Sequence, residues 1–111
     1  MENNQHELEM HEHKVRKTAM VLRAINHPLR QKMILLLHEN KRMTVTDIYT
    51  KLNLEQSVAS QHLAVLRREN FVITEREAKY IFYSVNYQRI KEVHQFASNI
   101  LHKDELMPNL S

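Results

Sequence analysis

The sequence predicts a mainly α-helical fold with one small β-hairpin, in the order α-α-α-α-β-β-α. Apolar residues recur every three or four positions along most of the 111-residue chain, which is the helical period. Two short runs rich in β-branched and aromatic residues stand close together at 71–85, which is typical of a hairpin. Glycine is absent and proline occurs twice, so flexible linkers and glycine-rich phosphate loops are excluded.

Length and composition predict a single domain. A chain of 111 residues with 42 % hydrophobic content can bury one core but not two. We expect this domain to span residues 1–106. Residues 1–7 could form a disordered leader, and residues 107–111 are expected to form a disordered tail. There is no apolar run of about eighteen residues and no signal peptide, which predicts a cytoplasmic protein with no membrane partner.

Two features of the composition narrow the chemistry. Cysteine is absent, which excludes disulfides, thiolate metal sites, iron–sulfur clusters and thiol redox sensing. The charge is also unevenly spread, because residues 1–13 carry four acids and no lysine or arginine, whereas residues 14–42 carry eight bases against Glu39 alone. A basic block of this kind indicates a polyanionic partner such as nucleic acid, although basic helix surfaces also occur without one.

The N-terminal half predicts two helices separated by a proline. Over residues 8–25, apolar side chains fall on one face of a helix about five turns long. Pro28 ends this helix, because proline disfavours helix before it and suits the first position of the next one. The second helix, 28–38, is apolar on most sides and is expected to be core.

Two shorter helices, a hairpin and a last helix follow. Thr44 and Asp47 match a capping box that opens a helix through residue 52, and a turn at 53–54 leads to a helix over 56–69. Residues 71–74 and 80–85 predict two strands joined by a loop of about five residues, "EREAK", built on a type I turn because no glycine is available for a tighter one. The last helix is expected over 87–102.

Two consecutive helices joined by a short turn and followed by a two-stranded wing predict a winged helix-turn-helix. In this motif the N-terminal half of the second helix enters the major groove of DNA. The helix over 56–69 fits that role, because Ala59, Leu63 and Leu66 form a stripe that can dock it on the core. Short polar side chains that lie off this stripe are expected to face DNA: Gln56, Ser57, Ser60 and Gln61.

Further DNA contacts are expected at basic positions. Arg76 and Lys79, at the tip of the predicted hairpin, can reach the neighbouring DNA backbone or minor groove. For Arg67 two interpretations remain, a contact to a DNA phosphate or a side chain that is only solvated. For His62 a phosphate contact stands beside a second interpretation, in which the ring is partly buried and bonded to the backbone. The expected DNA-binding set is Gln56, Ser57, Ser60, Gln61, His62, Arg67, Arg76 and Lys79.

With these residues described, the sequence resembles the ArsR/SmtB family of winged-helix bacterial transcriptional repressors. The resemblance spans residues 21–101 and is carried by "LRAINHPLRQKMILLL", by "TVTDIYTKLNLEQSVASQHLAVLRRENFV" and by "YIFYSVN". It implies a homodimer in which the first and last helices pair with their mates, and a double-stranded operator with dyad symmetry. It also implies repression in the DNA-bound form and release by a signal.

The sensing sites known in this family are incomplete here. The third-helix stretch "TVTDIYTKL" contains no cysteine, and the zinc site of the last helix keeps a His102/Glu105 pair but has Lys91 and Arg89 where its other ligands stand. On one helical face His6, Glu9 and His13 can instead bind zinc or nickel, with His102 from the last helix. Surface histidines in an acidic leader are the other interpretation. The effector stays open between a metal, a small organic ligand and none.

The residues do not predict an enzyme. Ser60 and His62 are two positions apart on a helix and point to different faces, and there is neither a nucleophile elbow nor a paired-carboxylate site. The alternative function is a winged-helix module that binds a protein partner without specific DNA binding.

Overall fold

The computed structural model describes the backbone of residues 2–106 and the side chains of residues 6, 7 and 9–99. The expected disordered tail at 107–111 lies outside the described residues. The element order confirms the predicted fold class: α1 (Glu2–Ile25), α2 (Pro28–Asn40), α3 (Val45–Lys51), α4 (Gln56–Arg68), β1 (Val72–Glu77), β2 (Tyr80–Val85) and α5 (Tyr87–Leu106). None of the described helices is both long and apolar enough to cross a membrane.

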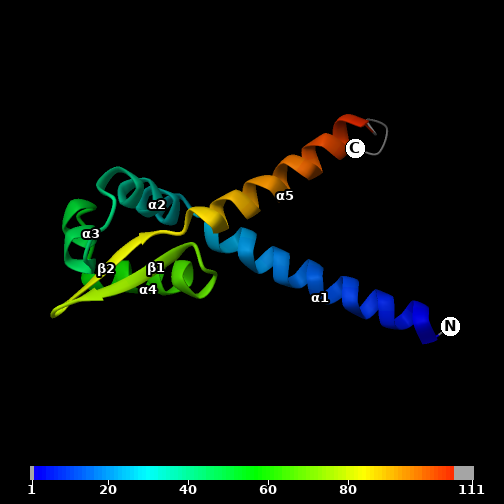
Figure 1. The fold of residues 1–111 in the computed structure, drawn as a ribbon, viewed down its shortest axis with the longest axis horizontal. Coiled ribbons are helices and arrows are strands. Elements are labelled where there is room, and N and C mark those ends of the chain that lie inside the picture. The colour runs from blue at the N-terminus through cyan, green and yellow to red at the C-terminus, as the bar shows by residue number, and fades with distance from the viewer. Residues whose placement is uncertain (1, 107–111) are drawn as a thin grey trace.

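The elements form a compact body with two projecting helices (Figure 1). Helices α2, α3 and α4 pack together beside the β1–β2 hairpin, whose tip points away from the projecting helices. Helices α1 and α5 leave the body on the same side and diverge along their length. The molecule is accordingly elongated, with principal extents of 56 × 33 × 23 Å.

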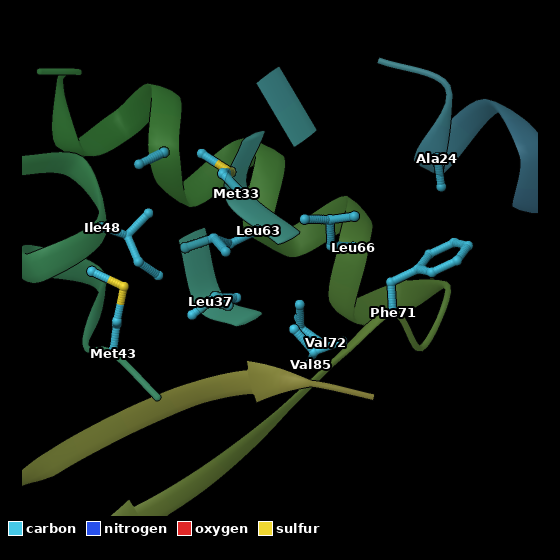
Figure 2. Close-up of a cluster of buried hydrophobic side chains, with 11 residues drawn as sticks. Ala24, Met33, Leu37, Met43, Ile48, Leu63, Leu66, Phe71, Val72 and Val85 are labelled. Carbon is cyan, nitrogen blue, oxygen red and sulfur yellow. The ribbon is translucent and has the colours of Figure 1, made fainter. Parts of the chain in front are cut away.

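One hydrophobic core holds the body together. Figure 2 shows side chains from α2, α3, α4 and the hairpin meeting in it, with Ala24 and Phe71 on the α1 side. The predicted core helix α2 supplies Met33 and Leu37, both with no solvent exposure. The largest fully buried side chains are Phe71, Met33, Leu37, Ile48, Leu63, Leu66 and Val72. Among residues with described side chains, no polar or charged residue is buried.

The two N-terminal helices are longer than the periodicity predicted. α1 begins at Glu2 rather than residue 8, and therefore passes through the expected leader. α2 begins as predicted at Pro28, with Nδ1 of His27 accepting a hydrogen bond from the backbone N–H of Leu29 at 3.2 Å. It ends at Asn40 rather than residue 38.

The capping box before α3 is confirmed. The Thr44 hydroxyl accepts from the backbone N–H of Asp47 at 3.2 Å, and the Thr44 N–H donates to the Asp47 carboxylate at 3.3 Å. α3 and α4 are then joined by a short turn in which Asn53 has a φ of 55°. Asparagine tolerates this left-handed conformation better than most residues, so the turn can be tight without glycine.

The predicted five-residue hairpin loop is wrong. β1 continues to Glu77 and pairs with Tyr80, which leaves only Ala78 and Lys79 in the turn. Ala78 takes a φ of 56°, and this costs a residue with a Cβ about 1–2 kcal/mol. The longer ladder compensates, since it adds the pairs Glu75↔Phe82, Arg76↔Ile81 and Glu77↔Tyr80. Arg76 also donates from Nε to the Ala78 carbonyl oxygen at 3.3 Å, which braces the turn.

Candidate nucleic-acid interface

Helix α4 has the two faces that the sequence predicted. Ala59, Leu63 and Leu66 are at most 1 % exposed and point into the core, where Figure 2 labels both leucines. The expected reading residues Gln56, Ser57, Ser60 and Gln61 are all exposed on the other side. Apolar docking of one face therefore presents a polar face to the surroundings.

The exposed side chains of α4 form two short rows. Gln56 lies one turn before Ser60, and Ser57 lies one turn before Gln61, so each pair projects from one side of the helix. Each amide can bond the N6 donor and the N7 acceptor on the major-groove edge of an adenine, and the hydroxyls can bond bases or phosphates. The α4 N-cap, Glu55, makes no side-chain capping bond, so the first backbone N–H groups of α4 stay available for a phosphate.

His62 lies on the flank of α4 and has a partner inside the protein. Its ring is half-buried, and its Nδ1 accepts a hydrogen bond from Nε of Arg30 on α2 at 3.2 Å. The His27 ring packs against it with the centroids 4.7 Å apart. Burial, followed by the charges of His27 and Arg30, lowers the pKa of His62 below 6.5. The partner of Nδ1 is thus a side chain rather than a backbone group.

The basic candidates lie at two places. Arg67 is exposed in the last turn of α4. Arg76 and Lys79 are exposed at the tip of the wing, where Lys79 Nζ lies 5.4 Å from the centroid of the Tyr80 ring. Because Nε of Arg76 is used within the turn, its terminal guanidinium nitrogens are left to meet a phosphate.

Sequence reasoning missed Arg42 as a wing contact. Arg42 follows α2, pairs with Glu77 at 2.6 Å and lies over the Phe82 ring at 4.1 Å. It thereby offsets one of the two wing acids, Glu75 and Glu77, that share the hairpin with the basic tip. The basic character of residues 14–42 was visible in the sequence, but the partner of each base was not.

The candidate metal ligands belong to α1 and α5. His6, Glu9 and His13 are exposed on α1 and line one shallow hollow together with Met10 and Lys14. Within the described part of the chain, no three His, Asp or Glu side chains are grouped closely enough to hold a metal ion. His102 belongs to α5 where side chains are not described. Two imidazoles and a carboxylate are suitable donors for zinc or nickel, but Lys14 in the same hollow opposes a cation.

Comparison with known proteins identifies the family. The profile described as "Bacterial regulatory protein, arsR family" matches residues 27–74, from the start of α2 into β1. The transcriptional activator HlyU of Vibrio cholerae is 35 % identical over 75 residues, covering 68 % of each chain. The transcriptional repressor PagR of Bacillus anthracis is 33 % identical over 75 residues, covering 68 % of this chain and 75 % of PagR. The chain belongs to the ArsR family.

The structure agrees with this assignment. NolR from Sinorhizobium fredii superimposes with a TM-score of 0.67 at 34 % identity, covering 83 % of this chain and 90 % of NolR. The predicted family and the winged helix-turn-helix fold are therefore confirmed. Members of the ArsR family are DNA-binding transcriptional regulators rather than enzymes, and this ArsR protein is one of them.

Proposed function

We propose that this ArsR-family protein is a repressor that binds a dyad-symmetric DNA operator as a homodimer. The N-terminal half of α4 enters the major groove, and Gln56, Ser57, Ser60 and Gln61 read base edges or neighbouring phosphates. The wing residues Arg76 and Lys79 contact the flanking backbone. PagR, a relative, carries the name of a repressor, while HlyU carries that of an activator.

The observation that carries the proposal is the polarity of α4. Its buried stripe fixes which side is free, and that free side carries amides and hydroxyls without a carboxylate. Such side chains suit DNA, whereas a protein-binding surface would present an apolar centre. The unit that binds is the domain over residues 1–106, acting in the cytoplasm where its DNA lies.

The homodimer is supported by the projecting helices. α1 exposes Met10, Val15 and Met20, and α5 exposes Phe96, all between 40 and 67 %. A groove between α1 and α5 adds Val21, Leu22 and Val93 to this apolar surface. Its other lining residues are Phe96 and the polar or charged Lys14, Lys17, Thr18, Arg89 and Glu92. Apolar surface of this extent is costly in water, and a second copy related by a twofold axis would cover it.

The wing supports backbone contact outside the groove. Arg76 and Lys79 stand at the tip of a hairpin that is braced by the Arg76–Ala78 bond and by the ion pair of Arg42 with Glu77 next to the turn. A rigid basic tip can neutralise phosphates next to the groove that α4 occupies. Affinity is then expected to fall steeply with salt.

The first experiment measures DNA binding by fluorescence anisotropy with fragments from the protein's own promoter and with random DNA. Replacing Gln56 and Gln61 with alanine should lower the operator-to-random affinity ratio by about tenfold or more, because each good bidentate amide contact is worth about 1–3 kcal/mol. Gln88→Ala, an exposed glutamine at the start of α5, is the matched control. Unchanged discrimination in the double variant would remove these amides from base reading.

The same assay separates the remaining alternatives. If no fragment is preferred, the winged-helix module that binds a protein partner becomes the better account. Adding zinc, nickel or a chelator shows whether a metal acts through His6, Glu9, His13 and His102. Sedimentation of the wild type and of Val15→Glu/Met20→Glu tests the dimer, since buried charge on α1 should yield monomers that bind DNA weakly.

A further inference from the structure

Arg30 stands where three helices meet. It lies in the first turn of α2, and its Nε donates to Nδ1 of His62 on α4 at 3.2 Å. Its Nη1 donates toward the carbonyl oxygens of Arg23 and Ala24, near the end of α1, at 3.1 and 3.2 Å. One planar guanidinium therefore joins α1, α2 and the recognition helix, which the single point charge of a lysine does not do equally well.

The contacts to α1 satisfy groups that the helix itself leaves open. The last carbonyls of a helix have no partner within it, and a cation near them complements the helix dipole. Gln31 adds a second bond of this kind, with its Nε2 donating to the Ile25 carbonyl oxygen at 3.1 Å. α2 thereby holds the end of α1 in a fixed position.

The contact to α4 supplies direction. Ala59, Leu63 and Leu66 hold α4 on the core, but apolar packing sets orientation only loosely. The hydrogen bond to His62 is directional, and His62 directly follows Gln61 on the reading face. This bond therefore limits how far α4, with the side chains that it presents to DNA, can rotate or shift relative to α2.

We infer that Arg30 is a positioning residue for DNA recognition, which sets the angle between α1 and α4 through its bond to a neutral His62. The inference rests on the proposed function, in which α1 joins the two copies and α4 reads the operator. In a twofold dimer this angle fixes the separation of the recognition helices, which has to match about one turn of DNA. Neither side chain needs to touch the DNA for this role.

Protonation of His62 opposes the link. Nδ1 accepts a hydrogen bond only while it carries no proton, and a charged ring would instead face the guanidinium. The charged and titratable groups around the junction lie on the three helices or directly next to their ends: Arg23, His27, Arg30, Arg68 and Glu69. Of these Glu69 alone is acidic, and it pairs with Arg68 at 3.6 Å. A contact between His62 and a DNA phosphate would instead favour the protonated ring, so affinity would then rise at the lower pH.

The test uses the full-length protein, its preferred promoter fragment and constant ionic strength, at about pH 5.5 and 7.5. In His62→Asn, the amide oxygen can take the place of Nδ1 and accept from Arg30 without titrating. We expect His62→Asn to bind within about twofold of wild type at the higher pH, and His62→Ala and Arg30→Met to bind about tenfold more weakly, as for a lost bond to a charged group. Lys32→Met is the control, because it removes a charge from an exposed position of α2.

The pH dependence and the ring titration separate positioning from other roles. Wild type should lose affinity at the lower pH relative to His62→Asn, and NMR should show the His62 pKa rising in Arg30→Met but not in Lys32→Met. The inference is overturned by any of three results. These are that His62→Asn binds DNA as weakly as His62→Ala, that Arg30→Met binds DNA as tightly as Lys32→Met, or that the pKa of His62 is the same in Arg30→Met and in wild type. Those outcomes would not contradict the proposed repressor function, whereas a wild-type protein that prefers no DNA fragment would contradict both proposals.

Discussion

The guanidinium of Arg42 lies over the ring of Phe82, with 4.1 Å between its central carbon and the ring centroid. Arg42 belongs to the connection between α2 and α3, and Phe82 belongs to strand β2 of the wing. The same guanidinium pairs with Glu77 on β1 at 2.6 Å. Arg42, a residue of the body, thus contacts both strands of the wing and holds the wing in a fixed orientation.

The contact between Arg42 and Phe82 should be measurable as a coupling free energy. In a double-mutant cycle with Arg42→Met and Phe82→Leu, we expect a coupling of about 0.5–1 kcal/mol in the free energy of unfolding by urea, as for a cation–π contact near the protein surface. Glu77→Gln should cost less, because both partners of that ion pair are exposed. Strictly additive effects of Arg42→Met and Phe82→Leu would show that the ring contact contributes no stability.

Lys41 should be a site where glycine stabilises the protein. Lys41 has φ 73° and ψ −57°, and the Arg42 N–H bonds the Asn40 carbonyl oxygen at 2.9 Å, which together form a strained γ-turn. Lys41→Gly removes the Cβ clash but increases the entropy of the unfolded chain, so the expected net gain is about 1 kcal/mol in urea unfolding. Lys32→Gly, inside α2, should instead lose about 1 kcal/mol. Equal losses in both variants would contradict the strain at Lys41.

Arg76 should contribute affinity without sequence preference. Arg76→Ala is expected to weaken binding to all DNA sequences about equally and to lower the salt slope of the binding constant by about one. The reason is that, in the proposed complex, the wing tip meets phosphates, which are the same at every base pair. Anisotropy titrations over a salt series, with Lys32→Ala as control, check this. A loss confined to one operator position would assign Arg76 to base reading instead.

Much of the fold was predictable because its signals are local. The α3 capping box needs only Thr44 and Asp47, and the buried stripe of α4 follows from the spacing of Ala59, Leu63 and Leu66. The exposed reading face follows from the same stripe by exclusion. Each of these features is encoded within one or two helical turns, so the sequence alone carries it.

The features that were missed depend on distant residues or on strain. Arg30 and His62 are 32 positions apart, and nothing in either segment indicates that one will bond the other. The two-residue hairpin turn was missed because it requires a positive φ at Ala78, a conformation that is unfavourable for alanine. Only the additional strand pairs next to the turn compensate for this cost. The role of His62 therefore required the packing of three helices, which local patterns do not report.

The stability of the protein should depend on pH through His62. Burial first, then His27 and Arg30, lower the pKa of His62 in the folded state below its unfolded value of 6.5. Between the two pKa values the unfolded chain binds more protons, so stability rises with pH across this window. The stabilisation is complete above about pH 6.5 and is lost progressively as the pH falls toward the folded pKa.

His62→Asn removes the titrating group while keeping an acceptor for Arg30. Urea midpoints measured at about pH 5.5, 6.5 and 7.5 should therefore fall toward low pH less steeply in His62→Asn than in wild type. Because the other histidines are retained in both proteins, their contributions cancel in this comparison. A wild type whose midpoint rises on acidification relative to His62→Asn would mean that the folded state favours charged His62, and the bond from Arg30 would then be absent in solution.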